Sequence, residues 1–256
     1  MTNTQLFQHR QPSGWPANVK LVSTGRAGGC SVGTYSSSNL AFHVGDDEYC
    51  VRRNRDALKS GCNGAGAIFW LNQIHSSKLV KARSDQAEGE EMAADASWTT
   101  DPGLACAVMT ADCLPVLVTD RAGSFVAAIH AGWRGMAADI LEKAITAFPG
   151  EPRDYLCWLG PAIGQNSYEV GPEVATALGG CTSGFASSDG IAVVRKVGSD
   201  RYLVDLKRAA EYRLVRKGVR DIHLVDSCTY TDSDRYFSYR RDGTTGRQAS
   251  LVYLTA

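Results

Sequence analysis

The sequence has 256 residues, of which 44% are hydrophobic and 21% are charged, a composition typical of a globular protein with a large buried core. Its 27 Lys and Arg residues balance its 27 Asp and Glu residues, so the basic excess of a nucleic-acid-binding protein is missing. No apolar run approaches the roughly 20 residues of a membrane span, and the first 16 residues do not resemble a secretory signal, so we expect a cytoplasmic protein without a membrane partner.

Hydrophobic periodicity and turn residues define the elements of the first half. Residues 1–17, broken by Pro12, Gly14 and Pro16, are predicted to form an N-terminal arm, and residues 18–24 alternate like a strand. A helix is expected after Asp46 or Asp47, ending near Gly61. Further strands are predicted at 67–72, 78–82, 104–110, 115–120 and 124–130, the last two joined by a hairpin at 121–123.

The second half contains three predicted helices. The first covers 136–148 before Pro149 and Gly150, the second covers 172–180, and the third covers 206–218 after Asp205 as N-cap. Strands are predicted at 154–160, 221–227 and 249–255. The span 104–130 leaves no room for helices between its strands, so the sequence predicts an α+β fold with mixed or antiparallel sheets. Without a repeat or a linker, residues 18–256 are expected to form a single domain.

Three reactive side chains stand where strand patterns end, namely His75 in LNQIHSS, Cys113 in TADCLP and His130 in IHAGWRG. Function often collects at such positions because a rigid scaffold directs side chains into a cleft. Taken singly, Cys113 is equally well explained as a small buried thiol, whereas His130 and His75 are better explained as a strand-end histidine and a solvated turn histidine. Together, two imidazoles and one thiolate suit zinc and leave a fourth ligand position open, as in catalytic sites. None of the eight cysteines forms a CxxC pair, so a structural zinc ribbon is not expected.

The residues after His130 suggest an anion site. Gly132 and Gly135 flank Arg134 at the start of a helix, where free backbone N–H groups and a guanidinium attract phosphate or carboxylate.

At these residues the chain closely resembles the YfiH-like laccase-domain family, also called polyphenol-oxidase-like proteins. The most specific shared motifs are TADCLP at 110–115 and HAGWRG at 130–135. Weaker matches run in the family's order from residue 26 to residue 247: RAGG at 26–29, NLAFHVGDD at 39–47, QIH at 73–75, ADA at 94–96, GPAIG at 160–164, YEVG at 168–171, FSYRRDG at 237–243 and TGR at 245–247. Cys30 departs from the aliphatic residue expected there.

The resemblance implies a zinc site at His75, Cys113 and His130 and a layered α/β/β/α fold similar to putative cysteine hydrolases. It also implies a purine nucleoside phosphorylase that deaminates adenosine and cleaves methylthioadenosine. Cys113, His130, Asp112 and Arg134 are then the expected catalytic residues, with Glu169 as an alternative proton carrier. Nucleoside and phosphate would be bound by residues of the matching motifs, which are Arg26, Asn39, His43, Gln73, Arg240, Arg241 and Arg247.

Three other readings remain open. The first is a copper polyphenol oxidase, with Met109 as a soft axial ligand, although five histidines are few for a four-copper cluster. The second is a metal-free hydrolase that edits peptidoglycan precursors with Cys113 as nucleophile and His130 as base. The third is a zinc-stabilised binding protein without turnover. Oligomeric state is not predicted.

Overall fold

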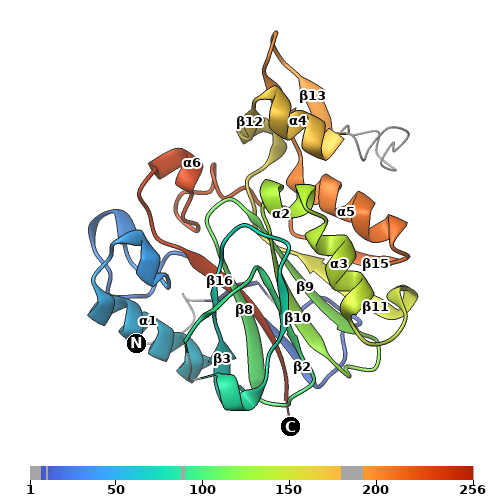
Figure 1. Cartoon of the computed structure of the whole chain (residues 1–256). Helices are drawn as coiled ribbons and strands as arrows, with labels where there is room; N and C mark the ends of the chain where they lie inside the picture. The colour runs from blue at the N-terminus through green and yellow to red at the C-terminus, as the bar shows by residue number, and fades with distance from the viewer. Residues whose placement is uncertain (1–6, 10, 88–89, 180–192, 256) are drawn as a thin grey trace.

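The computed structural model describes residues 7–9, 11–87, 90–179 and 193–255 (Figure 1). Two main β-sheets dominate it. The first is five-stranded, and its order is β1 (Phe7–His9), β2 (Val19–Thr24), β16 (Gln248–Leu254), β8 (Leu104–Thr110) and β3 (Ala67–Phe69). All its neighbours are antiparallel except β3 and β8, which run parallel.

The second main sheet has six strands. Its order is β15 (Asp221–Leu224), β11 (Tyr155–Leu159), β9 (Leu114–Asp120), β10 (Val126–Ala131), β7 (Ala96–Thr99) and β5 (Leu79–Lys81). The inner strands are antiparallel, whereas β15 and β5 join the two edges in parallel. The prediction of mixed sheets is therefore confirmed.

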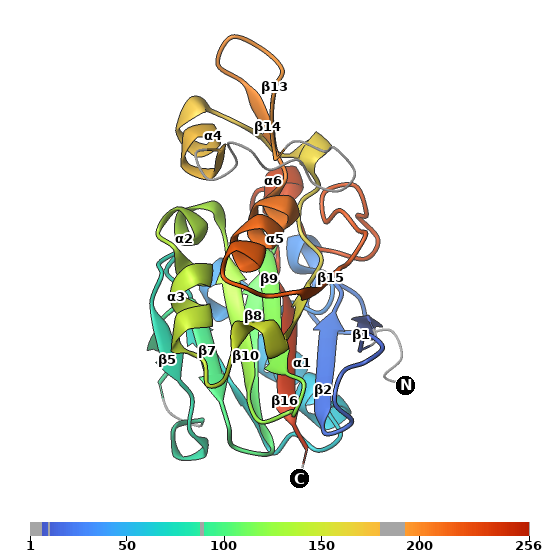
Figure 2. The same ribbon diagram turned by 90° about the vertical axis from the view of Figure 1, so that its right-hand side faces the viewer.

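The described residues also form two small β-sheets. One pairs β4 (Leu71–Asn72) with β6 (Met92–Ala93), and the other has the order β12 (Glu169–Val170), β14 (Tyr202–Val204) and β13 (Val194–Lys196). Together with α4 (Pro172–Gly179), the three-stranded sheet projects from one end of the molecule (Figures 1 and 2).

Alternation of side chains along β8 shows how the layers form. Leu104, Cys106 and Val108 face Leu117, Val126 and Trp158 of the second sheet, while Ala105, Ala107 and Met109 pack with Leu58 of α1 (Glu48–Gly61). On the far side, α3 (Ile140–Ala147) and α5 (Leu206–Arg216) cover the second sheet. Figure 2 shows these two helices beside β9 and β10. The order of layers is thus α/β/β/α, as expected from the family resemblance.

Burial on both faces explains the apolar strands in the middle of the sequence. Every residue of β8 and β10 is buried, and so are Leu114–Thr119 of β9. Continuous apolar runs are the pattern expected of strands that are covered on both sides.

The predicted helix over 136–148 is wrong in one respect, because it is two helices. The first, α2 (Trp133–Ala137), starts three residues earlier, and α3 begins at Ile140. Between them Asp139 has a φ of 63°, a left-handed conformation that ends one helix and that Asp tolerates better than most residues. Periodicity continues across this break because both helices pack against β10 and contribute apolar residues to the same core.

Other boundaries differ for similar local reasons. The predicted strand 67–72 is divided at Trp70 between two sheets, and β7, β6 and β12–β14 were not predicted because they are short and partly polar. Within the predicted arm, Phe7–His9 pairs with β2. The helix predicted at 172–180 ends at Gly179, and residue 180 lies outside the described residues. Of the helices in the described ranges, none has the length and apolar character that crossing a bilayer requires.

Candidate metal centre

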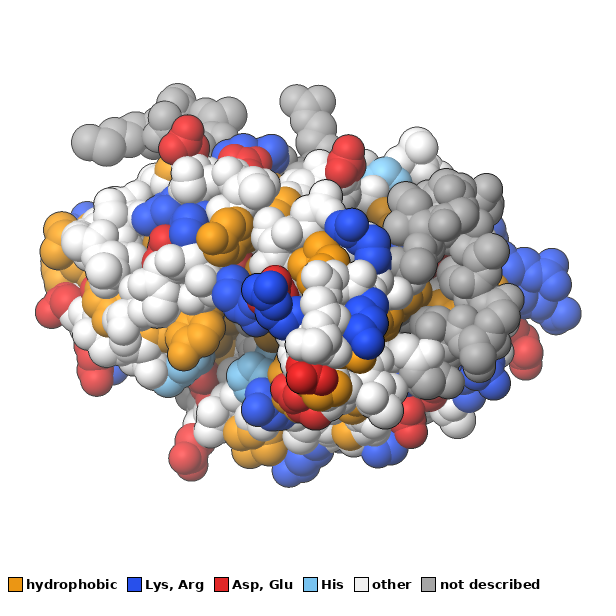
Figure 3. Space-filling view, turned by 90° about the horizontal axis from the view of Figure 1, so that it is seen from above, with side chains coloured by type: hydrophobic (Ala, Val, Ile, Leu, Met, Phe, Trp, Pro, Cys, Tyr) orange, Lys and Arg blue, Asp and Glu red, His pale blue; other side chains and the backbone are white. Residues whose placement is uncertain are grey.

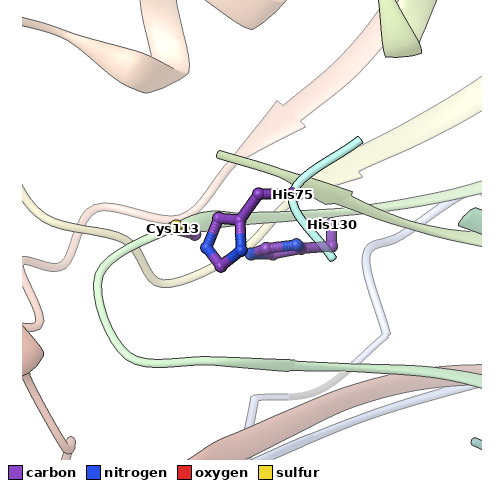
Figure 4. Close-up of side chains that lie close together, drawn as sticks. All are labelled: His75, Cys113 and His130. Atoms are coloured by element: carbon purple, nitrogen blue, oxygen red, sulfur yellow. The ribbon is translucent and has the colours of Figure 1, made fainter. Parts of the chain in front are cut away.

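His75, Cys113 and His130 converge at the end of the two main sheets that lies nearest to α2 and α6 (Tyr239–Asp242). One potential ligand atom from each residue lies within 4.8 Å of the other two. The imidazole rings are 4.9 Å apart between centroids and meet edge to face at 79°. Figure 4 shows the three side chains pointing toward one another. Within the described parts of the chain, this is the single group of three His, Cys, Asp or Glu residues with such spacing.

Strand topology brings Cys113 next to His130. The chain leaves the first sheet after β8 and enters the second at β9, and Asp112 makes this turn with a φ of 95°. Because β9 and β10 are antiparallel with His130 opposite Pro115, Cys113 lies near the end of the same ladder. His130 shares the strand face of Val126 and Ala128, so its ring points into the layer between the sheets.

Gly132 leaves the space that the thiol needs. A Cβ atom at this position would lie 3.0 Å from Cys113 Sγ and 3.5 Å from His75 Cδ2. The glycine of the HAGWRG motif therefore keeps the backbone close to the site.

A buried carboxylate holds both histidines. Asp95, fully buried, accepts hydrogen bonds from the backbone N–H groups of His75 (2.9 Å) and Ser76 (2.6 Å) and from the Ser76 hydroxyl (2.8 Å). Its Oδ1 is also 2.9 Å from His130 Nδ1. These contacts fix the turn that carries His75, which has a φ of 57°. They also leave His130 Nε2 free to face Cys113.

The charges of the site support one another. Burial raises the pKa of the Cys113 thiol, but the charge of His130 and hydrogen bonds from both histidines outweigh it and lower this pKa to about 6. Burial lowers the pKa of His130, whereas the Cys113 thiolate and Asp95 raise it to about 9. The thiol is thus prepared for ionisation, which is the form that binds metals and acts as a nucleophile.

The donor set fits a metal ion. Two imidazole nitrogens and a thiolate sulfur suit zinc, and a carboxylate behind a ligating histidine is the usual support in such centres. A cavity of about 320 Å³ opens beside the three side chains, so a fourth position would face a space able to hold a substrate. His75 is exposed, Cys113 is half-buried and His130 is buried. The cavity is lined by His43, Gln73, His75, Met109, Thr110, Ala111, Cys113, His130, Tyr239 and Arg247.

Three of the predicted substrate-binding residues, His43, Gln73 and Arg247, line this cavity. The Gln73 side-chain amide hydrogen-bonds to the backbone of Met109, donating to its carbonyl oxygen (2.8 Å) and accepting from its N–H group (2.7 Å). Arg247 Nη1 donates to the carbonyls of Thr245 and Gly246. Burial and the nearby Arg247 lower the pKa of His43, which favours its neutral form. Arg247 is thus the predicted cation that reaches the cavity.

Other predicted residues make structural contacts around the site. Asn39 is fully buried and joins Arg247 N (2.9 Å) to Asp46 Oδ2 (2.9 Å). Arg241 donates to three backbone carbonyls and to Asp242, its sequence neighbour. Arg26 lies over the ring of Phe237 and donates to two carbonyls of neighbouring loops.

Asp112 and Arg240 stabilise the turn at Cys113. The two carboxylate oxygens of Asp112 accept from Thr229 Oγ1 and from the backbone N–H of Arg240, each at 2.7 Å. The Arg240 guanidinium donates to the Glu169 carbonyl and lies over the ring of Tyr168.

Arg134 and Glu169 are more exposed. Arg134 packs its guanidinium on the neighbouring Trp133, and the Glu169 carboxylate pairs with Arg201 at 3.5 Å. Seen from above, basic side chains gather at this end of the molecule, with histidine visible at the surface nearby (Figure 3).

Asp95 and Tyr239 were missed as site residues. Asp95 stands in the ADA segment just before β7, where a charged residue between two small apolar residues is itself a signal that it has a partner. Tyr239, 61% exposed, contributes to the cavity lining, and the sequence gives no local sign of this position.

Comparison with known proteins supports this architecture. Residues 20–255 match the family described as multi-copper polyphenol oxidoreductase laccase. The chain is 43% identical to the purine nucleoside phosphorylase YfiH of Shigella flexneri over 240 residues, which cover 93% of this chain and 95% of the relative. It is 42% identical to a purine nucleoside phosphorylase of Pseudomonas aeruginosa over 239 residues, with the same shares of both chains.

Solved structures agree with the fold. The crystal structure of the Neisseria meningitidis protein NMB0706 is 42% identical, has a TM-score of 0.89 and covers 98% of this chain and 100% of its own. That of YlmD from Geobacillus stearothermophilus is 27% identical, with a TM-score of 0.87 and the same coverage. The family resemblance inferred from the motifs is thereby confirmed. The chain belongs to the laccase-domain family that includes the YfiH proteins.

Proposed function

We propose that this protein is a zinc-dependent purine nucleoside phosphorylase that also deaminates adenosine and cleaves methylthioadenosine. The observation that carries the proposal is the convergence of His75, Cys113 and His130 beside a cavity of about 320 Å³, in a chain whose relatives are named purine nucleoside phosphorylases. Such a cavity matches the lower end of the volumes found for small-molecule sites.

His75, Cys113 and His130 would hold the metal, which when bound supplies a Lewis acid and activates water at neutral pH. Asp95 orients the His130 ring through Nδ1 and fixes the backbone at His75. Ionised Cys113 contributes the negative charge that makes the site selective for a cation.

The remaining lining residues fit nucleoside and phosphate. In phosphorolysis a phosphate oxygen bonds to the ribose C1′, and the bond from C1′ to the base nitrogen breaks. Arg247 provides a cation for phosphate, and neutral His43 provides a hydrogen-bond partner. The exposed ring of Tyr239 offers a face on which a purine can stack.

Asp112 and Arg240 are assigned a positioning role in this scheme. Both oxygens of the Asp112 carboxylate already accept hydrogen bonds, which suits a residue that keeps Cys113 in place better than one that carries a proton. Arg134 remains the proposed anion-attracting residue near the start of α2.

The test is incubation of zinc-loaded protein with adenosine, with and without phosphate. Adenine and ribose 1-phosphate should form only with phosphate, and inosine and ammonia should form in both samples. Arg247→Ala should reduce the phosphate-dependent products, whereas Arg121→Ala, which removes an exposed arginine paired with Asp221, should not. Absence of all these products from fully loaded protein would reject the proposal.

A cysteine hydrolase is the second candidate. Cys113, His130 and Asp95 form a thiol–imidazole–carboxylate series like that of nucleophilic enzymes, with the thiol already easier to ionise. Full activity on a cell-wall peptide after chelation would favour it. Metal analysis also distinguishes the copper reading, for which Met109 in the cavity lining would be the soft ligand.

A further inference from the structure

Cys30 and Cys50 form a thiol pair away from the candidate metal centre. Cys30 lies in the loop after β2, and Cys50 lies in the first turn of α1. The Cys30 sulfur is 3.5 Å from the Cys50 carbonyl oxygen, and the Cys50 sulfur is 3.3 Å from the Cys30 carbonyl oxygen. These reciprocal contacts place each thiol against the backbone of the other cysteine, so the two side chains are neighbours.

The backbone around this pair is held in place. Asn54, almost fully buried on α1, accepts from Cys30 N (3.0 Å) and donates to Ser31 Oγ (3.0 Å) and Asn39 O (2.9 Å). A side chain at Gly29 would collide with the loop backbone and with Asn54. Cys30 is therefore kept against the start of α1 rather than carried on a free loop.

Cys30 and Cys50 differ from the other described cysteines in being two partly accessible thiols that lie side by side. Cys30 and Cys50 are both half-buried, whereas Cys62, Cys106 and Cys157 are buried, and burial raises the pKa of each of their thiols. Cys113 belongs to the metal centre. Cys228 is half-buried, and its sulfur accepts from Gly164 N at 3.1 Å. Solvent can thus reach two adjacent thiols that have no role in the proposed catalysis.

We propose that Cys30 and Cys50 are a redox-active dithiol that hydrogen peroxide converts into an intramolecular disulfide. The Cys30 sulfur attacks a peroxide oxygen, the O–O bond breaks, and Cys30 sulfenic acid and water result. The Cys50 sulfur then attacks the Cys30 sulfur, the S–S bond forms, and the S–O bond breaks to release a second water. Two thiols are oxidised and one peroxide is reduced. The product does not depend on the order of attack, because either thiol can form the sulfenic acid and the other thiol then displaces water from it.

The disulfide would tether one wall of the substrate cavity. The segment between the two cysteines carries His43, which lines the cavity, and Asn39, whose Oδ1 accepts from Arg247 N. Closing this segment into a covalent loop restricts the unfolded chain and opposes local opening of the wall.

The printed sequence allows a direct test by peptide mapping. Trypsin cleaves after Arg26 and next after Arg52, so one peptide, 27–52, contains both cysteines. Reduced, zinc-loaded protein is treated with equimolar peroxide, alkylated and digested. We expect this peptide to be unalkylated and lighter by two hydrogens, and to regain both alkyl groups after treatment with a reductant. The melting temperature of oxidised protein should rise by about 5 °C.

Variants give the control. Cys30→Ser and Cys50→Ser should each abolish both the linked peptide and the shift in melting temperature, whereas Cys228→Ser, at another half-buried thiol, should preserve them. Zinc content measured in the same samples separates oxidation of Cys113 from oxidation of the pair. The proposal is overturned if both thiols of peptide 27–52 remain alkylated while Cys113 or Cys228 is oxidised, or if Cys30 pairs with a different cysteine.

Discussion

A single buried carboxylate organises the candidate metal centre at the scale of residues. The Asp95 carboxylate forms hydrogen bonds both with the backbone of the turn that carries His75 and with the ring of His130. These two histidines are 55 residues apart in the chain. Burial alone would raise the pKa of Asp95, but hydrogen bonds from His130 and Ser76 lower it, so the carboxylate stays charged. One negative charge therefore holds both candidate metal-binding histidines in place.

Replacing Asp95 with Asn tests this role. The amide keeps the shape of the side chain but loses its charge and presents two N–H donors where acceptors are needed, so the backbone at Ser76 loses a partner. We expect zinc affinity to fall by about 10- to 100-fold, measured by competition with a chromophoric chelator. Asp101→Asn is the matched control, because Asp101 accepts from Ser84 N at 3.0 Å outside the site. Equal affinities of Asp95→Asn and the unmodified protein would contradict the role.

At the scale of elements, the helical layer over the second sheet depends on one buried cation. Arg213 of α5 is 3% exposed at its side chain and pairs with Glu142 (2.6 Å) and Asp139 (3.3 Å) at the start of α3. Asp139 is also the residue in left-handed conformation that separates α2 from α3. The ion pairs thus join α5 to the break between α2 and α3, which the sequence pattern did not predict.

Arg213→Ala should therefore destabilise the protein. Removal of the guanidinium leaves Glu142 partly buried without its partner, and we expect a loss of about 3 kcal/mol in the free energy of unfolding. The melting temperature would fall by about 6–12 °C. Arg121→Ala, at a pair whose side chains are both at least half exposed, should change stability by less than about 1 kcal/mol. If the two variants melted at the same temperature, the α3–α5 contact would not have this importance.

At the scale of the whole molecule, the candidate centre joins both main sheets. Cys113 lies where the chain passes from β8 in the first sheet to β9 in the second, and His130 ends β10. His75 arrives from the turn after β4. A metal held by all three would cross-link segments that belong to different layers.

Metal removal should consequently lower global stability. A ligand that binds only the folded state stabilises it by about 4 kcal/mol when its free concentration is about 1,000 times the Kd. We expect chelation to lower the melting temperature of zinc-loaded protein by several degrees and zinc to restore it. Cys113→Ala should melt at the same temperature with and without chelator. A chelator-independent melting temperature in the unmodified protein would argue against a resident metal.

The sequence by itself determined the elements and the chemistry of the ligands. Continuous apolar runs predicted the strands at 104–110 and 115–120, and the short links implied mixed or antiparallel sheets. Asp205 was placed correctly as a helix N-cap, and Asp47 is the N-cap among the two candidates, Asp46 and Asp47, that the sequence offered for α1. Motifs identified the family and the three residues of the candidate metal centre, because side-chain type and local order can be read directly from the sequence. Local patterns also explain the errors, since periodicity cannot register a single left-handed residue such as Asp139.

Only the tertiary structure decided which residues share the site. Arg26 and Arg241 carry the same guanidinium group as Arg247, and all three donate to loop carbonyls, yet of the three Arg247 lines the cavity. The Asn39 amide is buried and bridges Asp46 and the backbone of Arg247. Asp95 became a site residue because sheet pairing places β7 beside β10, and Cys30 meets Cys50 because the loop after β2 folds onto α1. The physical reason is that packing of the two sheets and their helices brings distant segments together. Local sequence patterns do not show which distant segments will be neighbours in the fold.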